Sequence, residues 1–572
     1  MSRLIPTPLP PTVATFTVLS DGDVVPPRYH VLSILVEKGV NRIPSATLVL
    51  RDGDPAAQTF AVSESDYFLP GKKVEVKAGY QGTEESIFTG VVVSHGIKIR
   101  EQRSVLQIVC KDESFKMTVA PQCAYFNEEK DSDILTSVIE KAGLQAEVTA
   151  TSEVQQQVVQ YNCTDWDFLL TRTDAIGKIC LADNGKITIT EPTISGDPEL
   201  ELEFGATILD FDAELDTRNQ FTSITGQSWI PADQEWSTET AEDYNAPEAS
   251  DLSPTDLADA HGVSDYPIRH GGTLTESERL AWTNARLQKS RLAKIRGRAK
   301  FQGLATILPN QLVKLNGLGA RFNGLVYISA IRHEIGDGNW TTNVELGLDE
   351  SWFAERFEIS QVRNGGLIPP VSGLQIGTVT ALAGDPDGEE RIQVRLPLVD
   401  GQAEGCWARI ANLDAGDSRG SYFRPEIDDE VVLGFLDNDP RQAIVLGGLY
   451  SSAKPAPITN TDENDEKGFF SREGMKLLFN DKNKDILLET PDGNAIELSG
   501  ANQSVSITDQ HGNKIVMDSA GIELQSSKDL TLTANAGNVN INGIAVKAEG
   551  QATAELSASG TTTIRGGLVQ IN

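Results

Sequence analysis

Residues 485–498 read DILLETPDGNAIEL, two short apolar segments on either side of an Asp-Gly-Asn turn. Similar units follow at intervals of seven to ten residues, and apolar and polar side chains alternate within most of them. An alternation with a period of two is typical of strands that bury one face. The predicted strands are 486–488, 496–498, 505–507, 515–517, 522–524, 530–532, 539–541, a short one around Ile564, and 569–571.

The segment 480–572 contains no Phe, Tyr, Trp or Cys and a single proline, Pro491. Each predicted strand offers only a few small aliphatic side chains, too few to close a core within one chain. Exposed strand edges pair readily with other chains, so we expect a homotrimer whose strands wrap around one axis. The alternative is a single-chain β-solenoid, although such coils usually have longer repeats. The expected needle core is Ile496, Leu498, Val505, Ile507, Ile515, Met517, Ile522, Leu524, Leu530, Leu532, Val539 and Ile541.

Length and composition indicate a chain of several domains. The 572 residues predict about three or four domains, because a single core rarely grows that large. No apolar stretch is long enough to span a bilayer. The N-terminus is rich in proline and lacks the apolar block of a secretory signal, so we expect synthesis and assembly in the cytoplasm. The net charge of −33 argues against nucleic acid as a partner, because phosphate binding needs a basic face.

The N-terminal region combines predicted strands with two helices. Strands at 31–36, 46–50, 73–76, 87–93 and 105–109 are separated by Gly and Asp and predict a small barrel within residues 1–120. A helix at about 131–142 has apolar residues at helical spacing and Gly143 as its expected C-cap. A second helix, at 165–176, has Thr164 as its expected N-cap and ends before Gly177.

An acidic segment and a basic helix follow. No Lys or Arg lies between Arg218 and Arg269, and residues 231–268 are rich in Asp and Glu. This composition predicts a disordered surface loop, with a docking arm for a partner as the alternative. Thr275 and Glu278 form a capping-box pattern at the start of the next helix. Its basic residues indicate either a solvated face or a contact with an acidic neighbouring subunit; they are Arg286, Lys289, Arg291 and Lys294.

Residues 375–450 contain five short predicted strands with Gly and Asp turns, which indicates an OB-like barrel. The strands are 376–380, 392–396, 407–410, 430–436 and 443–446. The segment lacks a basic face interleaved with aromatic residues, so a structural role is favoured over nucleic-acid binding.

Ordered motifs in this barrel resemble the OB domain of VgrG-type spike proteins and contractile phage tail spikes. The motifs are GTV at 377–379, DPDG at 385–388, RIQV at 391–394, CWARI at 406–410, RPEIDDEVVL at 424–433 and DNDPRQAIVLGGLY at 437–450. Their signature residues are Arg391, Trp407, Arg409, Pro425, Glu430, Asp439, Pro440 and Gly447. Motifs of the first part resemble the tail-hub half of the same proteins; they are FTGVV at 88–92, DWDFL at 165–169, FNG at 322–324, IRH at 331–333 and WTT at 340–342.

The resemblance implies a mainly β fold with an α+β hub. Its parts would be tail-hub β-barrels at 1–365, an OB-fold collar at 366–452, a connector at 453–474 and a C-terminal intertwined triple-stranded β-helix at 475–572 of a homotrimer. The hub would cap the inner tube and meet the baseplate proteins of a contractile injection machine. The needle would carry a PAAR-repeat tip protein, puncture the target envelope and deliver effector cargo. Leu568, Val569 and Ile571 would form the platform for that tip.

The same reading implies a protein that is not an enzyme and that needs no cofactor. The connector is too short for the lysozyme domain of some phage spikes, and we expect no effector domain after the needle. Walker, GxSxG and HExxH motifs are absent, and His333-Glu334 lacks a second histidine at the required spacing. Five cysteines without CxxC spacing indicate neither a disulfide framework nor a zinc site.

Two groups of residues have metal-ligating side chains, but simpler interpretations are favoured. Asp256, Asp259, His261 and Asp265 are interpreted as part of a random acidic loop. Asp481, Asn483 and Asp485 alternate as in an EF-hand, but Ile486 stands where the tight turn needs Gly, so they are interpreted as a polar entry to a strand. No histidine follows His511, so we expect no metal at the tip. Two alternative functions stay open for a trimeric β-rod: an envelope-degrading enzyme and a receptor-binding tail fibre.

Overall fold

The computed structural model describes residues 13–571 except Gln102, Asp243 and Glu248. The chain divides into two units, Met1–Leu367 and Ile368–Asn572. Each unit is described by itself below. No helix among the described residues is both long and apolar enough to cross a membrane.

One large sheet dominates the described part of the first unit. Its path runs β14-β18-β21-β20-β3-β4-β7-β6-β5-β1-β2, with β19 paired to β20 and β13 paired to β19. The strands are β1 (Ala14–Ser20), β2 (Asp23–Val24), β3 (Val31–Gly39), β4 (Ser45–Arg51), β5 (Lys73–Tyr80), β6 (Thr83–Arg100), β7 (Arg103–Lys111), β13 (Leu200–Glu203), β14 (Asp210–Leu215), β18 (Ile295–Gln302), β19 (Leu312–Asn316), β20 (Gly324–Gly336) and β21 (Asn339–Leu346).

The strands expected between residues 31 and 109 are confirmed as β3 to β7, but they do not stand alone. β3 pairs antiparallel with β20, and Gly39 lies opposite Ala330. One core lies beneath β1 and β3–β7, around Leu48, Leu106 and Phe68. A second lies beneath the strands between residues 200 and 346, around Phe301 and Val344. A local sequence pattern could not show the β3–β20 pairing, because its partners are about 300 residues apart in the chain.

A smaller α/β part confirms both predicted helices. α1 (Asp131–Lys141) ends before Gly143, whose φ of +76° suits glycine. α2 (Asp165–Ala175) begins at Thr164, whose hydroxyl accepts a hydrogen bond from the backbone N–H of Asp167 at 3.1 Å. The remaining elements here are β8 (Pro121–Lys130), β9 (Gln145–Val148), β10 (Val154–Thr164), β11 (Ile179–Asp183) and β12 (Lys186–Thr190), with 3₁₀ turns η1 (Asp66–Phe68) and η2 (Glu113–Thr118) earlier in the chain.

The acidic segment is folded, so the prediction of a disordered loop is wrong for its described residues. β15 (Ser223–Ile230) pairs with β16 (Glu235–Thr240) and β17 (Asp265–His270), and α3 (Pro254–Asp259) lies between the latter two. Its carboxylates are used locally. Asp256 closes a capping box with Ser253, and Asp265 accepts hydrogen bonds from the hydroxyls of Ser223 and Thr225. Composition alone did not reveal these bonds, and those of Asp265 link residues that are 42 and 40 positions apart in the sequence.

The helix expected after Thr275 is confirmed as α4 (Glu276–Leu292), with the capping box between Thr275 and Glu278 in place. It packs on β15 and β16. Two short turns follow later in the first unit, α5 (Phe353–Arg356) and η3 (Arg363–Gly366).

The second unit begins with a closed five-stranded barrel in the order β22-β23-β24-β28-β27. The five predicted strands are confirmed as β22 (Gln375–Ala381), β23 (Ile392–Arg395), β24 (Cys406–Ile410), β27 (Glu430–Phe435) and β28 (Ala443–Gly448). Alternate side chains fill the interior, among them Val379, Val394 and Leu433. Two smaller elements lie between the barrel strands. A hairpin of β25 (Ala415–Gly416) and β26 (Arg419–Gly420) lies between β24 and β27, and a 3₁₀ turn, η4 (Leu436–Asn438), lies between β27 and β28.

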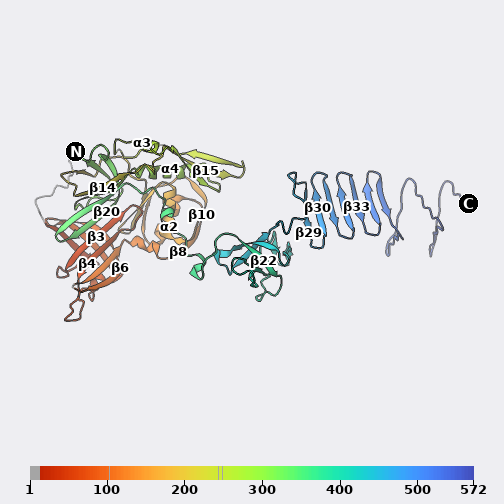
Figure 1. Cartoon of the computed structure of the whole chain (residues 1–572), viewed down its shortest axis with the longest axis horizontal. Coiled ribbons are helices and arrows are strands. Elements are labelled where there is room, and N and C mark those ends of the chain that lie inside the picture. The colour runs from red at the N-terminus through yellow and green to blue at the C-terminus, as the bar shows by residue number, and fades with distance from the viewer. Residues whose placement is uncertain (1–12, 102, 243, 248, 572) are drawn as a thin grey trace. The chain divides into compact units, whose positions relative to one another are not determined.

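A seven-stranded antiparallel sheet follows, in which each strand pairs with the next along the chain. Figure 1 shows β30 to β33 side by side in blue. Tight turns at Gly493 and Gly512, with φ of +90° and +86°, connect neighbouring strands. The strands are β29 (Glu466–Phe470), β30 (Lys476–Asn480), β31 (Asp485–Glu489), β32 (Ala495–Ser499), β33 (Ser504–Thr508), β34 (Lys514–Asp518) and β35 (Gly521–Gln525).

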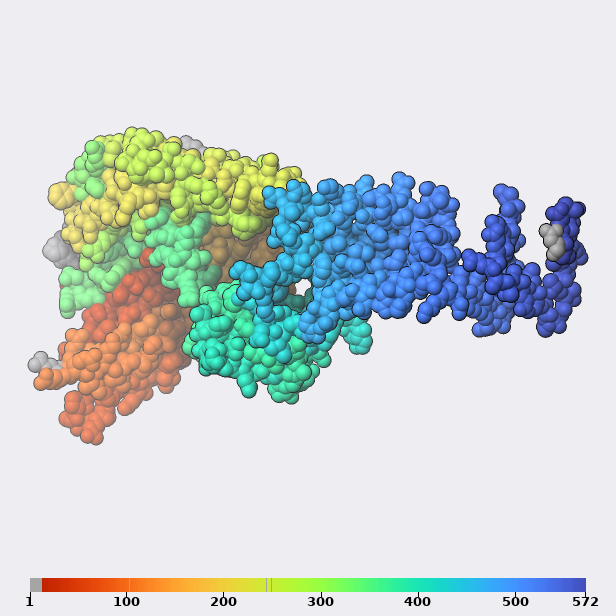
Figure 2. All heavy atoms as spheres, turned by 45° about the vertical axis from the view of Figure 1, so that its right-hand side comes forward, coloured from red at the N-terminus to blue at the C-terminus, as the bar shows by residue number. Residues whose placement is uncertain are grey.

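The strands predicted beyond residue 526 are not formed in the described chain. Residues 526–571 contain turns and bends but no strand, although strands had been expected at 530–532, 539–541, around Ile564 and at 569–571. Figure 2 shows these residues in dark blue as open loops that do not pack into a layer. A strand needs a hydrogen-bonded neighbour, and the last one that the chain supplies to itself is β35.

Candidate functional site

The seven-stranded sheet of the second unit carries two columns of apolar side chains on one face. The residues within each column lie directly opposite one another in consecutive strands. One column is Phe469, Leu477, Leu488, Ile496, Ile507, Ile515 and Leu524. The other is Phe479, Ile486, Leu498, Val505, Met517 and Ile522.

This apolar face is uncovered in the single chain. Ile496 is 39% exposed, Leu498 44% and Ile522 68%. The central column of the opposite face mixes polar with apolar residues and is therefore less apolar; it contains Gly468, Leu478, Leu487, Glu497, Ser506, Val516 and Glu523. A contiguous exposed apolar patch rimmed by polar residues marks an interaction site. We name the two columns together the apolar face.

The edges of this sheet are also open. Within the described residues β29 pairs only with β30, and β35 pairs only with β34. Each edge strand therefore leaves a row of backbone N–H and C=O groups without a sheet partner, a surface on which further strands can pair. The apolar face and the open edges together favour assembly with other chains.

Eight of the twelve predicted needle-core residues lie on the apolar face. They are Ile496, Leu498, Val505, Ile507, Ile515, Met517, Ile522 and Leu524. The other four lie beyond β35 and are exposed; they are Leu530, Leu532, Val539 and Ile541. The tip-platform residues Leu568, Val569 and Ile571 are also exposed. Whether any of these residues lies in a shared core remains a prediction.

Sequence reasoning missed the start of the apolar face. Phe469, Leu477 and Phe479 belong to the same two columns. Phe469 lies in the predicted connector, 453–474, whereas Leu477 and Phe479 lie in the predicted needle but not among its expected core residues. The pattern of Leu477, Leu478 and Phe479 after a Gly-containing turn was the available signal. Phe469 stacks on Phe423 of the barrel loop, with ring centroids 5.4 Å apart.

The eight OB-signature residues are spread over the strands and loops of the barrel. Trp407 and Arg409 lie on β24, Glu430 begins β27, Gly447 lies on β28, and Pro425 precedes β27. The guanidinium of Arg391 donates to Asp385 at 3.0 Å through Nε and also pairs with Asp387. These contacts hold together the two ends of the loop between β22 and β23.

A second loop contact in the barrel joins Asp439 to Arg441, on either side of Pro440. The Nε and Nη2 atoms of Arg441 donate to the two carboxylate oxygens of Asp439 at 3.0 and 2.6 Å. Hydrogen bonds from the side chain and backbone of Arg441 lower the pKa of Asp439. Of the eight signature residues, Arg391 and Asp439 thus have oppositely charged partners within loops of the barrel.

The basic residues of α4 lie inside the first unit, so both interpretations offered for them are wrong. Lys289 Nζ lies 3.0 Å from the Asp174 carboxylate and donates to the carbonyl of Ser351 at 2.9 Å. Arg291, Lys294 and Arg286 donate to backbone carbonyls of Phe221, Ala249 and Glu350. Burial lowers the pKa of Lys294. The spacing of charges along the helix could not predict that these cationic side chains would donate to buried backbone carbonyls.

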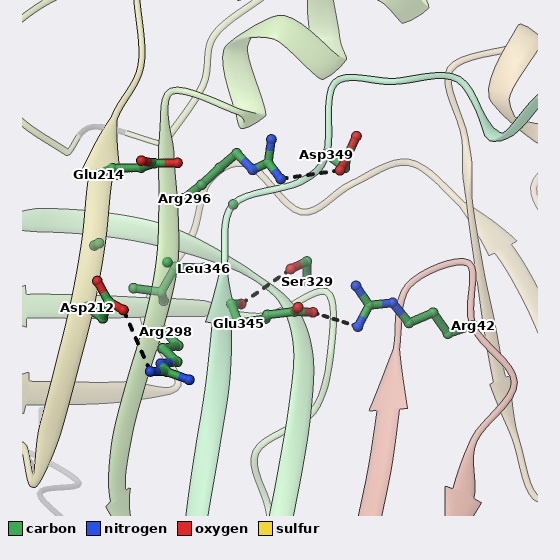
Figure 3. Close-up of a pocket in the computed structure, with 12 residues that line it drawn as sticks. Arg42, Asp212, Glu214, Arg296, Arg298, Ser329, Glu345, Leu346 and Asp349 are labelled. Atoms are coloured by element: carbon green, nitrogen blue, oxygen red, sulfur yellow. Dashed lines mark hydrogen bonds and ion pairs between the residues drawn. The ribbon is translucent and has the colours of Figure 1, made fainter. Parts of the chain in front are cut away.

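One face of the large sheet holds a groove of about 530 Å³ lined by residues of both charges. Figure 3 shows Arg42 paired with Glu345, and Arg298 paired with Asp212; the ion-pair distances are 2.7 and 3.6 Å. Arg296 reaches Asp349 on the same side. Cations and anions thus alternate across neighbouring strands.

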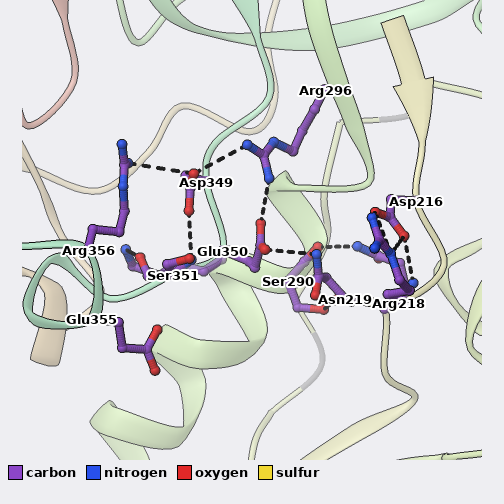
Figure 4. Close-up of polar contacts among 12 residues, drawn as sticks. Asp216, Arg218, Asn219, Ser290, Arg296, Asp349, Glu350, Ser351, Glu355 and Arg356 are labelled. Atoms are coloured by element: carbon purple, nitrogen blue, oxygen red, sulfur yellow. Dashed lines mark hydrogen bonds and ion pairs between the residues drawn. The ribbon is translucent and has the colours of Figure 1, made fainter.

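The polar contacts continue beside this groove. Figure 4 shows Arg296 between Asp349 and Glu350, at 3.3 and 2.9 Å, while Asn219 donates to Glu350 at 2.8 Å. Arg218 beside Asp216 lowers the pKa of that carboxyl to about 2. The contacts of Arg296 and Asn219 join the segment after β21 to β18 and to the segment that precedes β15.

The residues weighed for chemistry are not brought together. His333 is buried, its Nδ1 lies 2.9 Å from the Thr342 hydroxyl, and burial lowers its pKa to about 3. His261 bonds to the carbonyl of Gln220, away from Asp256 and Asp265, which have the partners named above. Among the described residues no three His, Cys, Asp or Glu side chains gather at one point as metal ligands would.

Another group weighed as metal ligands lies in the second unit. The Asp485 carboxylate accepts a hydrogen bond from the Ser499 hydroxyl at 3.0 Å. Asp481, directly after β30, pairs with Lys467 of β29. Both carboxylates therefore serve the turns of the sheet.

Three family models match the sequence. Residues 10–337, more than half of the chain, match the Alg8 N-terminal domain. Residues 375–450 match the type VI secretion system/phage-baseplate injector OB domain, the segment that forms the closed barrel. Residues 485–572 match the phage baseplate V C-terminal trimerisation domain, which includes most of the apolar face.

Curated relatives are spike proteins of type VI secretion systems. VgrG1b of Pseudomonas aeruginosa is 25% identical over 269 residues, 42% of this chain and 34% of that protein. VgrG3 of Vibrio cholerae is 33% identical over 105 residues, 16% of this chain and 10% of that protein. The aligned part thus spans about a third or less of the length of these relatives.

Solved structures show weaker likeness. A 43 kDa tail protein of prophage MuSo2 from Shewanella oneidensis has a TM-score of 0.45 at 14% identity, covering 59% of this chain and 99% of that one. An E. coli component of the type VI secretion system has a TM-score of 0.36 at 13% identity, covering 76% and 99%. The family models and curated relatives carry the assignment: the chain belongs to the family defined by the Alg8 N-terminal domain, and it is a VgrG-type hub–spike protein of contractile injection systems.

Proposed function

We propose that three copies of the chain form the hub and spike of a contractile injection machine. Residues 1–365 form the hub that caps the inner tube and contacts the baseplate, 366–452 the collar, 453–474 the connector and 475–572 the needle. The needle carries a PAAR-type tip protein on Leu568, Val569 and Ile571, crosses the target envelope on sheath contraction and delivers cargo. The trimer is assembled in the cytoplasm, then joins the particle and leaves the cell with it.

The apolar face is the observation that carries this proposal. Two aligned columns of aliphatic side chains lie uncovered on a segment that matches a trimerisation domain. Burying one Ile, Leu or Val is worth roughly 1.5–3 kcal/mol, and a threefold assembly covers the columns of three copies at once. Strands from neighbouring copies also supply the missing partners of residues 526–571.

Mass photometry of the purified chain at micromolar concentration tests the assembly. We expect the mass of three chains and trimers that resist SDS at room temperature. A population of monomers alone would contradict the proposal.

Truncation of the chain before Gly566 tests the proposed tip platform. The truncated chain should no longer capture a PAAR-repeat tip protein but should still form trimers. Intact capture would contradict the assigned platform.

The proposed spike has no catalytic activity of its own. The curated relatives above are named as spike proteins, while another, from Vibrio cholerae, is named as an actin cross-linking toxin. A zymogram of the purified chain on peptidoglycan distinguishes the structural spike from an envelope-degrading enzyme. We expect no clearing, and a cleared zone would overturn the non-enzymatic assignment.

A further inference from the structure

A cavity of about 460 Å³ lies in the first unit, between the smaller α/β part and α4. α2 and α4 contact each other, and both helices contribute to the wall of the cavity (Figure 1). The rest of the wall comes from the connection between β9 and β10 and from the segment between β17 and α4. Cavities of this volume, lined by apolar side chains and a few polar groups, are typical of small-molecule sites.

Part of the lining is apolar and includes one large flat ring. The apolar lining residues are Ala150, Ile176, Leu274, Ala281 and Trp282. Trp282 is half-buried, because it also packs against the small core around Leu287. That packing holds the indole ring in place while part of it remains accessible from the cavity.

Two cationic side chains line the cavity, but both are already neutralised. The Nε and Nη2 atoms of Arg172 donate to one carboxylate oxygen of the buried Asp131, at 2.9 and 2.6 Å. The other oxygen accepts a hydrogen bond from the Gln155 amide at 3.0 Å. Lys178 is paired with the carboxylate of Glu191. These cations therefore leave no unbalanced positive charge for an anionic ligand.

Two carboxylates of the lining have no such cation. They belong to Glu153, in the β9–β10 connection, and to Glu278, in the first turn of α4, and no ion pair to either is found among the described residues. One oxygen of Glu278 accepts the backbone N–H of Thr275 at 2.9 Å, a bond that does not cancel its charge. His270 also lines the cavity, and its Nδ1 lies 3.0 Å from the carbonyl oxygen of Gly272. An accessible indole ring thus shares a cavity with two unpaired carboxylates.

We propose that this cavity binds an organic cation with an apolar body: an ammonium, amidinium or guanidinium group joined to a hydrocarbon chain or an aromatic ring. Glu153 and Glu278 supply the opposite charge, and a charged N–H donor forms strong hydrogen bonds with carboxylates. The apolar body packs against Trp282 and Ile176, and the face of an indole ring itself attracts a cation. The inference does not depend on the proposed trimer.

α4 already makes contacts of this kind further along its length. Lys289 Nζ lies 5.5 Å from the ring centre of Trp352, and the guanidinium of Arg286 lies 5.6 Å from that of Tyr266. Those cations belong to the chain itself. At Trp282 the ligand would supply the cation.

Three probes of nearly the same size and shape test the charge preference. Benzamidine is a cation at pH 7, benzamide is neutral, and benzoate is an anion. Each is titrated into the full-length chain and followed by saturation-transfer NMR. We expect benzamidine to bind at least about tenfold more tightly than benzamide, and benzoate to bind most weakly. Equal affinities, tighter binding of benzoate, or no binding of benzamidine up to about 10 mM would overturn the proposal.

Substitutions in the lining locate the site. Glu153→Gln with Glu278→Gln removes both charges, and glutamine at the second position can still close the capping box of α4. In this variant the affinity for benzamidine should fall to that for benzamide. The matched control is Glu140→Gln with Glu147→Gln, which changes the net charge equally at residues outside the lining and should bind like the original chain. Trp282→Leu keeps an apolar side chain and should weaken benzamidine binding several-fold.

Urea denaturation of each variant shows whether the first unit is still folded. Glu153→Gln alone lies in a connection rather than in a helix, so it remains informative if the double variant is destabilised. It should lower the affinity for benzamidine several-fold and leave that for benzamide unchanged. A double variant that is folded and still prefers benzamidine over benzamide would overturn the assignment of the two carboxylates.

A free amine and a basic side chain of a protein segment carry the same cationic chemistry. N-acetyl-Phe-Arg-amide represents the second source. Binding of this peptide more tightly than benzamidine would support a protein segment as the ligand, whereas the reverse order would support a small molecule. Either ligand should lose its affinity in the Glu153→Gln, Glu278→Gln variant, and retained peptide binding would place the peptide outside the cavity and contradict that source.

Discussion

Lys289 and Asp174 form a buried ion pair between α4 and α2. The side chains are 9% and 4% exposed, and Asp174 also accepts a hydrogen bond from the backbone N–H of Phe353 at 2.7 Å. The cation also lies 5.5 Å from the ring centre of Trp352. The pair thus joins two helices and the segment after β21, three parts that are distant in sequence.

Replacing Lys289 with Ala should leave the Asp174 carboxylate buried without its cation. We expect a loss of roughly 3–5 kcal/mol in the free energy of unfolding of the first unit. Urea denaturation followed by tryptophan fluorescence measures it. Lys141→Ala, which removes a half-exposed cation, is the control and should cost less than about 1 kcal/mol. Equal effects of the two variants would contradict the structural role of Lys289.

His333 should make the first unit less stable in acid. Its pKa is lowered from 6.5 to about 3 in the folded chain, chiefly by burial. Between these values the unfolded chain binds more protons at this residue, so its contribution to stability is fully present above pH 6.5 and falls as the pH drops toward 3. The measurement is urea denaturation at pH 7, 5.5 and 4.5.

His333→Asn cannot titrate and is the comparison for that measurement. The difference in unfolding free energy between pH 7 and pH 4.5 should be smaller in this variant, by up to about 1.4 kcal/mol for each pH unit. An unchanged pH dependence would show that His333 is not the group responsible.

The sequence predicted the strands of the apolar face correctly, but not how far those strands extend along the chain. The alternation at 496–498 and 515–517 was sufficient to predict strands with one apolar side, and the register aligns those sides in two columns. The pattern could not show that the single chain leaves residues 526–571 without partners, because that depends on strands from elsewhere. The prediction of a disordered acidic segment was wrong for another reason. Asp256 is bonded within the segment to Ser253, and Asp265 accepts a hydrogen bond from Ser223, which lies outside it.

The same distinction holds for the large sheet and for α4. The capping box at Thr275 is a local motif and was correctly predicted. The β3–β20 ladder and the carbonyl contacts of Arg291 and Lys294 join distant parts of the chain, so a single sequence does not reveal them. The OB barrel was identified because its motifs follow one another in sequence order.

Ile515→Asp should abolish assembly of the needle. The residue lies between Ile507 and Leu524 in one apolar column, and three copies would bring three carboxylates into one dry layer. Mass photometry should show loss of the trimer. Ser506→Asp, on the opposite face of β33, is the control and should assemble normally. Normal trimers of the Ile515 variant would refute the shared core.

The substitution Leu530→Asp tests whether the segment after β35 is part of the shared needle core of the proposed trimer. Leu530 is 58% exposed in the single chain, so the substitution should not disturb the sheet of one copy. If neighbouring copies cover it, the trimer should lose thermal stability, measured as the temperature at which SDS-resistant trimers disappear. An unchanged temperature would place Leu530 outside the needle core.

At the scale of the whole molecule, the second unit has a surface that one chain leaves open, the apolar face. A net charge of −33 per chain opposes association at long range. In the proposed trimer, burial of the aliphatic side chains of the apolar face has to outweigh this repulsion.

A cryo-EM reconstruction of the full-length particle is the most direct test of the shared needle. The account predicts a threefold axis along residues 485–571, with Ile496, Ile515 and Leu524 of all three copies turned toward it in successive layers and continuous strands beyond residue 526. A single copy with its apolar face in solvent, or a coil closed by one chain alone, would contradict it.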